Sequence, residues 1–413
     1  MSKSETAVME RVDLADAVMF DDPYPRYAEL RRVAPVAPAY SRQLLGGAGF
    51  MLTRYADVQL LHNDLRFSSA PSNEAPGFLM RHLPPTFRLL TDSMVYKDDP
   101  DHARLRRLVN KAFTPRRIGE LTGEIERIVG RLLDDLERRG SDTVDLVSAL
   151  AVPLPLSVIS TMLGVDDTER DEFHVLMERF VLRLGSGAPA DALRSIPTAR
   201  KLYAVLLRLV ARRRAEPDDG MITALLQASE DGDSLSDDEV MGMIYLLMLA
   251  GHDTTANLIG SSTVALIEHA DQAERWRAEP ELAPSAVEEL LRFTTPVPCG
   301  TARTVLEDVE IEGTTLPAGT KVLGMIISAC RDEAVFDRPD ELDLGRDPNR
   351  HLAFAFGKHF CLGNQLARLE GQIALGELVR RFPGIRLAVP RPELRYKPAQ
   401  SLRGFRTLPV TLR

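Results

Sequence analysis

Apolar residues recur at helical spacing through most of the chain, and the longest such run begins at Ser236. The run SDDEVMGMIYLLMLAGHDTTANLIGSSTVALIEHA predicts a helix of roughly 33 residues, on the order of 50 Å long. Ser236 and Glu239 have the spacing of a capping box, which would begin the helix. The first half is apolar on every side and predicts burial, yet the polar string AGHDTT interrupts it. Because buried polar groups need partners, this interruption is a candidate functional segment.

The rest of the pattern predicts further helices and a smaller set of strands. Helical spacing covers residues 21–34, 55–64, 98–116, 118–139, 144–163, 168–184, 195–215 and 364–382. Strand-like runs bounded by Gly and Pro cover Gly49–Thr53, parts of 293–332, and Leu387–Leu412. No linker divides the chain, so we expect one domain over residues 1–413, mainly α with a smaller β-rich portion.

Composition and charge fit a soluble globular chain. Its 413 residues are 44% hydrophobic and 27% charged, which is enough to bury a large core. The net charge of −9 argues against nucleic-acid binding. The three cysteines are widely spaced, which excludes a disulfide scaffold and fits a reducing compartment. The first residues contain no long apolar run, so we expect no signal peptide, no membrane anchor and a cytoplasmic location.

The segment Phe354–Gly363, FAFGKHFCLG, contains the clearest candidate chemistry. Gly357 and Gly363 frame Cys361, and a predicted helix follows immediately. The dipole and free N–H groups of a helix N-terminus favour a thiolate, which a soft metal such as haem iron accepts as an axial ligand. On spacing alone, a buried structural cysteine is an equally good interpretation.

The same segment resembles the haem-ligand loop of the cytochromes P-450, whose pattern is F-x-x-G-x-(R/H)-x-C-x-G. The fixed positions are matched by Phe354, Gly357, His359, Cys361 and Gly363. The resemblance implies that Cys361 ligates the iron of haem b and that its thiolate pushes electron density toward O–O cleavage. It also implies the family's fold, with the haem between the long helix and the helix that follows the Cys loop.

The polar interruption of the long helix resembles the family's oxygen-binding groove, (A/G)-G-x-(D/E)-T-T. The matching residues are Ala250, Gly251, Asp253, Thr254 and Thr255. Small residues would leave room for dioxygen, and a Thr hydroxyl can displace the i−4 hydrogen bond of a helix and hold a water. The resemblance implies that Asp253 and Thr254 deliver protons. We interpret His252, at the variable position, as a helix-surface or hydrogen-bonded residue.

A His–Arg pair supplies a third match. His102 and Arg106 lie four residues apart, on one edge of a predicted helix. The resemblance implies that both bind haem propionates together with Arg303 and His359, because cationic donors suit carboxylates. Without the resemblance, a solvated pair would be the default interpretation.

Three further segments match the family in order along the chain. Glu289-Leu-Leu-Arg292 resembles its E-x-x-R pair, which implies support for the haem loop, although alone it is a common helix salt bridge. Phe336–Arg346 resembles the meander that precedes the haem loop. The segment that usually lines the substrate pocket is matched by Val297, Pro298 and Cys299.

Two loops are candidates for closing the substrate site. Ser68–Ser93 combines Pro and Gly with large apolar residues, and exposed linkers are rarely so apolar, so we expect it to close over a lipophilic molecule. An ordinary packed loop is the alternative. Gly185–Pro189 could be the mobile lid that the resemblance implies, or a plain surface turn.

The matches together imply a soluble, monomeric bacterial cytochrome P-450. The implied reaction inserts one oxygen atom from dioxygen into a C–H or C=C bond of a lipophilic small molecule. Electrons would pass from NAD(P)H through ferredoxin reductase and ferredoxin, since no flavin or iron–sulfur segment is visible. Two alternatives stay open: a peroxygenase that uses hydrogen peroxide, and a non-catalytic haem protein that recruits a partner.

We expect the redox partner to bind a basic patch. Arg104, Arg107 and Lys111 fall away from the edge that holds the His–Arg pair, so we predict that they face solvent beside the haem. Arg350 and Lys358 belong to the segment around the Cys loop and are expected to border the same face. Such a patch on an acidic protein would attract an acidic ferredoxin, while a solvated helix face is the alternative.

Overall fold

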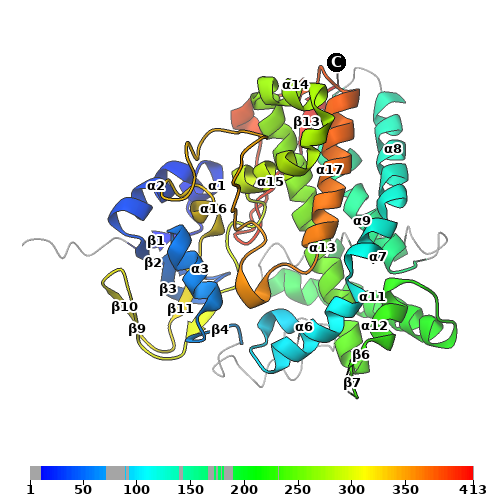
Figure 1. Cartoon of the computed structure of the whole chain (residues 1–413), viewed down its shortest axis with the longest axis horizontal. Coiled ribbons are helices and arrows are strands. Elements are labelled where there is room, and N and C mark those ends of the chain that lie inside the picture. The colour runs from blue at the N-terminus through cyan, green and yellow to red at the C-terminus, as the bar shows by residue number, and fades with distance from the viewer. Residues whose placement is uncertain are drawn as a thin grey trace, which may run out of the picture.

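The long predicted helix is α13 (Asp237–Glu268), which crosses the helical part of the molecule (Figure 1). The computed structural model describes residues 11–70, 89, 93–138, 143–165, 172–173, 175–177, 179–180, 189–230 and 232–412. The predicted capping box is confirmed, because Ser236 Oγ accepts from Glu239 N–H and the Glu239 carboxylate accepts from Ser236 N–H at 2.8 Å. The polar string does not break the helix, which continues without interruption to Glu268.

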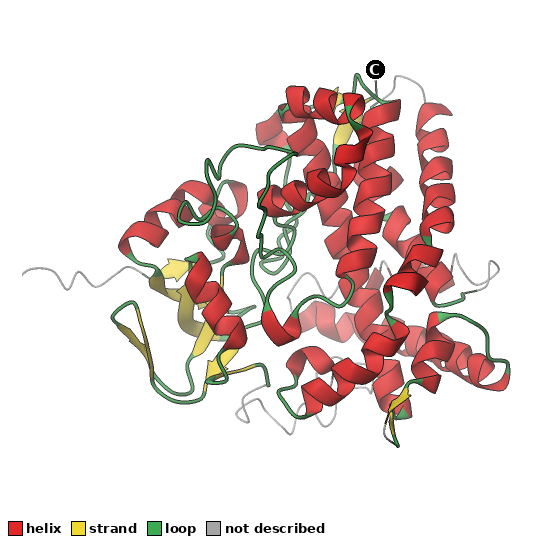
Figure 2. Cartoon of the chain, in the orientation of Figure 1, coloured by secondary structure: helices red, strands yellow, loops and turns green. Residues whose placement is uncertain are grey.

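Helices form most of the described chain (Figure 2). The α-helices besides α13 are α1 (Ala17–Asp21), α2 (Tyr24–Val33), α3 (Tyr55–Asn63), α6 (Asp101–Ala112), α7 (Pro115–Glu120), α8 (Thr122–Arg138), α9 (Pro153–Met162), α11 (Pro189–Ala215), α12 (Met221–Gln227), α14 (Ala270–Ala278), α15 (Ala283–Thr294), α16 (Ile326–Ala329) and α17 (Asn364–Arg381). Short 3-10 turns are η1 (Met94–Tyr96), η3 (Pro280–Leu282), η4 (Gly357–His359) and η5 (Arg391–Glu393), and η2 (Val147–Ala151) is π-helical.

Most predicted helices match these elements to within a few residues, although the predicted 98–116 is divided between α6 and α7. Two others differ further at their start. The predicted helical segment 144–163 starts too early, because β5 (Val144–Asp145) pairs with β13 (Pro409–Thr411) before η2 and α9 begin. That pairing joins segments far apart in the chain, so local periodicity does not reveal it. Helix α11 begins at Pro189, earlier than the predicted 195. Within the predicted helix 168–184, the described residues are helical.

The strands gather mainly in one six-stranded sheet beside the helical part (Figure 1). Its order is β1 (Val12–Asp13), β2 (Val36–Ser41), β3 (Gly47–Leu52), β11 (Lys321–Gly324), β8 (Arg303–Val305) and β4 (Phe67–Ser68). The β1–β2 and β3–β11 pairs are parallel and the others antiparallel. The smaller sheets are β12 (Arg386–Leu387) with β13 and β5, β9 (Val309–Ile311) with β10 (Thr314–Leu316), and β6 (Ser229–Glu230) with β7 (Asp233–Ser234).

The prediction of a mainly α fold with a smaller β-rich portion is therefore confirmed. Helices α9, α15 and α17 pack around α13 and form the main core. In the ranges that the structure describes, no helix combines the length and apolar character needed to cross a bilayer. The single domain stays a prediction. The loop Ser68–Ser93 lies largely outside the described residues, and so does Gly185–Pro189 apart from Pro189.

Helix α17, which follows the Cys loop, carries a buried carboxyl group. Glu370 is 2% exposed, and its Oε2 has no hydrogen-bond partner among the described residues. Burial raises the pKa of Glu370 from 4.5 to about 8. The folded protein therefore holds a proton on this group at neutral pH that the unfolded chain releases.

We predict that Glu370→Gln removes a pH dependence of stability. An acid with a raised pKa stabilises the fold fully below its unfolded pKa of 4.5, and that stability falls as pH rises to about 8. The free energy of unfolding should decline by up to about 1.4 kcal/mol per pH unit in this window. Denaturant unfolding of the wild type from pH 5 to 9 measures the slope, which Glu370→Gln should flatten. Glu377→Gln, a more exposed position on α17, should leave it unchanged; an equal slope in the Glu370 variant contradicts the prediction.

Candidate active site

Cys361 lies in the loop that leads into α17. Its backbone N–H donates to Phe354 O at 2.9 Å, which closes the loop around the 3-10 turn η4. Gly357 has a φ of 69°, and a Cβ there would lie 2.3 Å from Asn63 Oδ1 and 3.0 Å from His62 O. Only glycine therefore allows the loop to pack this closely against the end of α3.

The electrostatic surroundings of Cys361 work in two directions. Burial raises the pKa of the thiol, while the Gly363 backbone N–H and the guanidinium groups of Arg106 and Arg368 lower it. Burial outweighs the other effects, so the helix N-terminus alone does not produce a thiolate. A metal cation bound at the sulfur would reverse this balance, because a coordinating thiol loses its proton.

Four basic side chains, two arginines and two histidines, converge beside this loop from elements far apart in the sequence, and we call them the cationic cluster. His102 and Arg106 come from α6, Arg303 comes from β8, and His359 comes from η4. The rings of His102 and His359 are 4.1 Å apart between centroids. Burial lowers the pKa of Arg106 and of Arg303, and together with the Arg303 charge it lowers that of His359 to about 3.

Several donors of this cationic cluster lack a hydrogen-bond partner within the described part of the chain. They are both ring nitrogens of His102 and the Nε and Nη1 atoms of Arg303. The nearest acid to His102 is Asp99, whose Oδ1 is 3.6 Å from Nδ1, and Ser69 Oγ lies 2.9 Å from His359 Nε2. Buried donors without acceptors are unfavourable, so the cluster fits an anionic ligand. The two propionates of a haem are carboxylates of this kind, and they would place the porphyrin beside Cys361.

One strip of α13 is accessible, although most of this helix is buried. Ala250 is exposed, and Thr254, one turn later, is partly exposed. Thr254 Oγ1 donates to Ala250 O at 2.6 Å, so the hydroxyl engages the i−4 carbonyl, the group at which the sequence analysis expected a Thr hydroxyl to act. Gly251 lies against α9, where an added Cβ would be 3.2 Å from Ile159 Cδ1. Its small size thus permits close helix packing.

Asp253 lies on a neighbouring, buried face of α13. Its Oδ1 is 3.0 Å from Lys397 Nζ and 3.7 Å from His252 Nδ1. Sequence reasoning missed Lys397, because no motif marks it and 144 residues separate the two partners. The side chain of His252 is 3% exposed, which excludes the interpretation as a helix-surface residue.

Glu289 and Arg292 form a fully buried ion pair in α15. Two hydrogen bonds of 2.7 Å join them, and both side chains are 0% exposed. Arg292 also donates to the carbonyls of Cys330, Pro339 and Glu341. Glu289 also accepts from Asp343 N–H, Arg346 and Asn349. The pair therefore connects α15 to the segment that precedes the Cys loop.

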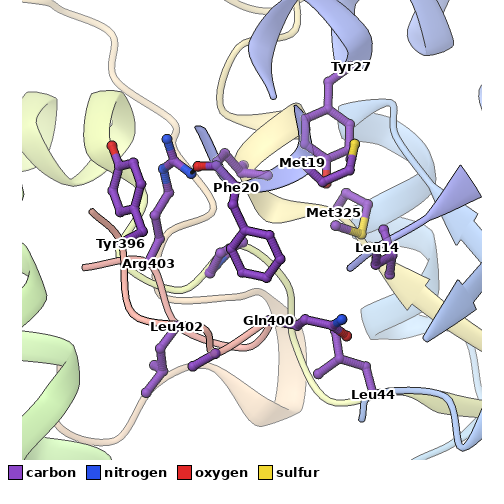
Figure 3. Close-up of a pocket in the computed structure, with 13 residues that line it drawn as sticks. Leu14, Met19, Phe20, Tyr27, Leu44, Met325, Tyr396, Gln400, Leu402 and Arg403 are labelled. Atoms are coloured by element: carbon purple, nitrogen blue, oxygen red, sulfur yellow. Dashed lines mark hydrogen bonds between the residues drawn. The ribbon is translucent and has the colours of Figure 1, made fainter. Parts of the chain in front are cut away.

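The predicted pocket segment divides between two environments. Pro298 lines a cavity of about 30 Å³, where Leu14, Leu44 and Met325 face Gln400 and Leu402 of the C-terminal loop (Figure 3). Val297 is partly exposed. Cys299, in contrast, is 2% exposed and packs in a core cluster with Tyr27 and Met51. This placement argues against Cys299 as a pocket-lining residue.

The predicted basic patch needs a correction. Arg104 was expected to face solvent, but it pairs with Asp233 at 3.1 Å and with Glu239 at the start of α13. Lys111 donates to Ser229 O at 2.8 Å. These contacts join α6 to the β6–β7 hairpin and to α13, so the charge of Arg104 is neutralised. Arg107 and Arg350 are exposed, and Lys358 lies 3.5 Å from Asp99.

A partly buried cysteine before a helix, an accessible strip on a long buried helix, and a cluster of basic side chains with unsatisfied nitrogens define a class of protein. They are the parts expected of a haem-thiolate enzyme. A family model described as "Cytochrome P450" matches residues 55–385. The chain belongs to the cytochrome P-450 family, and it is an oxidoreductase of the monooxygenase type.

Individual relatives resemble the chain over nearly its whole length. "Vitamin D(3) 25-hydroxylase" of Pseudonocardia autotrophica is 40% identical, over 98% of this chain and 98% of that protein. "Cytochrome P450 107B1" of Saccharopolyspora erythraea is 39% identical, over 96% of this chain and 98% of that protein. The solved structure of PksS, from the bacillaene polyketide synthase of Bacillus subtilis, has a TM-score of 0.88 at 35% identity, over 97% of this chain and 99% of that chain. Family membership implies a haem-iron cofactor.

Proposed function

We propose that the protein is a bacterial haem-thiolate monooxygenase that holds one haem b through Cys361 and oxidises a lipophilic small molecule. The observation that carries the proposal is the cluster of buried cationic donors beside Cys361, whose His102 and Arg303 nitrogens lack acceptors in the described chain. A haem supplies both an iron for the sulfur and two carboxylates for the donors. When bound, it supplies the oxygen chemistry: one oxygen atom enters the substrate and the other leaves as water, with two electrons and two protons.

Each residue near the thiol has a separate part in this proposal. Cys361 Sγ would ligate the iron, and Arg106 and Arg368 would stabilise its thiolate charge. His102, Arg106, Arg303 and His359 would hold the propionates. The loop contacts of Phe354 and Gly357, with Gly363 before α17, would keep the sulfur in place. Glu289 and Arg292 would support this loop from behind.

The residues of α13 would have two roles: to leave room for dioxygen and to supply protons. The small side chains of Ala250 and Gly251 would leave room for dioxygen beside α13. Thr254 Oγ1 would give up its bond to Ala250 O to donate toward the oxygen side, and Asp253 would resupply the proton. An intact Asp253 and Thr254 support a monooxygenase over a peroxygenase, which has less need of proton delivery.

The substrate is proposed only as a class. Two relatives are named as hydroxylases of vitamin D(3) and of 6-deoxyerythronolide B, and one structural neighbour was solved with testosterone. These names support a lipophilic substrate for hydroxylation or epoxidation here. Val297 and Pro298 stay candidates for the pocket wall. Electron delivery from NAD(P)H by ferredoxin reductase and ferredoxin, a monomeric state and a cytoplasmic location also stay predictions.

Cys361→Ser should abolish the thiolate signature of the bound haem. The reduced carbon monoxide complex of the wild type is expected to absorb at the wavelength that gives the family its name. The serine variant should lose that band, because an alcohol is a poorer ligand than a thiolate. Cys299→Ala, which removes a thiol in a separate core cluster, is the matched control and should keep the band. A full band in the Cys361 variant would falsify the assignment.

Thr254→Ala should uncouple electron consumption from product formation. The variant should still oxidise NAD(P)H with its ferredoxin system, yet release more hydrogen peroxide, because the groove lacks its hydroxyl donor. Product per NAD(P)H should fall, within a limit of roughly 10²–10⁴-fold set by general acid–base catalysis. Thr254→Ser keeps the hydroxyl and should stay coupled. Wild-type coupling in the alanine variant would contradict a role of Thr254 in proton delivery. Product formed with hydrogen peroxide alone, without NAD(P)H and ferredoxin, would favour the peroxygenase.

The corrected basic patch gives a test of ferredoxin docking. Reversing Arg107 and Arg350 to Glu should slow reduction by an acidic ferredoxin at low salt, since exposed charges act mainly on the association rate. The difference should shrink at high salt, where screening acts over about 8 Å or less. Arg26→Glu on α2 is the control for charge alone. Stopped-flow reduction rates that are equal in the wild type and the double variant at low salt would place docking elsewhere.

A further inference from the structure

We infer that Lys397 is a positioning residue that holds the Asp253 carboxylate for proton delivery. The inference rests on the proposed role of Asp253 and deepens it. Lys397 Nζ lies 3.0 Å from Asp253 Oδ1, and the two side chains are only 22% and 12% exposed. An ion pair with so little solvent around it is screened less than a surface pair.

The C-terminal loop that carries Lys397, between Tyr396 and Phe405, packs against α13. Tyr396 and Phe405 form an isolated β-bridge with rings stacked at 4.5 Å, and Lys397 N–H donates to Gly404 O at 2.8 Å. A Cβ on Gly404 would lie 1.8 Å from Asn257 Oδ1, so the loop backbone lies directly against α13. Asn257 is one turn beyond Asp253. The loop therefore meets two successive turns of α13, and this fixes Lys397 opposite Asp253.

Without Lys397 the carboxylate has another partner close by. His252 Nδ1 is 3.7 Å from the same Oδ1 atom of Asp253. Removing the lysine would leave a mostly buried carboxylate that can turn toward the histidine. Thr254, the proposed recipient of the proton, lies next along the helix and about 100° around it. Lys397 thus holds the Asp253 carboxylate in one orientation and prevents it from turning toward His252. It acts through Asp253 and does not touch the reacting atoms.

The test compares Lys397→Met with Lys397→Arg in the haem-loaded, full-length protein. In the methionine variant, product per NAD(P)H should fall about tenfold and peroxide should rise, which is a smaller loss than removal of an acid–base group. The KM for a probe substrate that shifts the haem spectrum should stay constant. The arginine variant should recover coupling, because it restores a cation. Lys397→Gln is made in parallel, so that either neutral variant decides the outcome if the other does not fold.

Two further variants make the result specific. Arg395→Met removes a cation two residues away, one whose side chain bonds only to local carbonyls in the described structure, and it should leave coupling unchanged. Asp253→Asn should uncouple turnover by itself. Adding Lys397→Met to Asp253→Asn should then cause no further loss, because the lysine acts through the acid.

The possible failures are distinguishable. Wild-type coupling in Asp253→Asn would overturn the proton role of Asp253 and, with it, the proposed function of this segment. Uncoupling in Asp253→Asn together with normal coupling in the Lys397 variants would overturn only the inference about Lys397. Additive losses in the double variant, or no recovery in Lys397→Arg, would likewise show that the lysine does not act by holding Asp253.

Discussion

The buried Glu289–Arg292 pair is the interaction that anchors the chain segment leading to Cys361. Both side chains are 0% exposed, so the pair is stable only because hydrogen bonds satisfy the remaining donors and acceptors. Those bonds reach Cys330, Pro339 and Glu341 through the arginine. Loss of one partner would leave a buried charge uncompensated, at roughly 3–5 kcal/mol. The chain that leads to Cys361 is therefore anchored by charge as well as by packing.

The cationic cluster differs from this ion pair, because the described chain does not supply hydrogen-bond partners for all of its buried nitrogens. His102, Arg303 and His359 lie together in a poorly solvated place, where burial lowers the pKa of each group and so disfavours its charged form. A dianionic cofactor would relieve this strain and stabilise the folded state by mass action. Binding of the cofactor and stability of the fold are expected to be linked for this reason.

Sequence reasoning succeeded where the signal was local. The capping box at Ser236, the helix after Cys361 and the Gly357 turn depend on neighbouring residues, and each is found where the pattern indicates. The convergence of His102 with His359 was reached only through family resemblance, because the fold brings together residues that periodicity cannot pair.

The failures have a common physical cause. Arg104 was predicted to face solvent from its place on a helical wheel, but α13 and the β6–β7 hairpin cover that side with Glu239 and Asp233. Val144 was assigned to a helix, but β13 offers it a strand to pair with. In each case a distant segment decides the environment, and a single sequence does not show that segment.

The sequence marks α13 as a candidate functional helix, but it does not show which neighbouring segment each residue of the motif contacts. The string AGHDTT reads as one motif, yet the helix turns by about 100° per residue and sends its members in different directions. Ala250 and Thr254 share the accessible strip, whereas Gly251 admits α9 through contact with Ile159. Asp253 meets a third element, the C-terminal loop. A motif of adjacent residues thus contacts different parts of the fold, so the residues proposed for proton delivery are held by packing on more than one side of the helix.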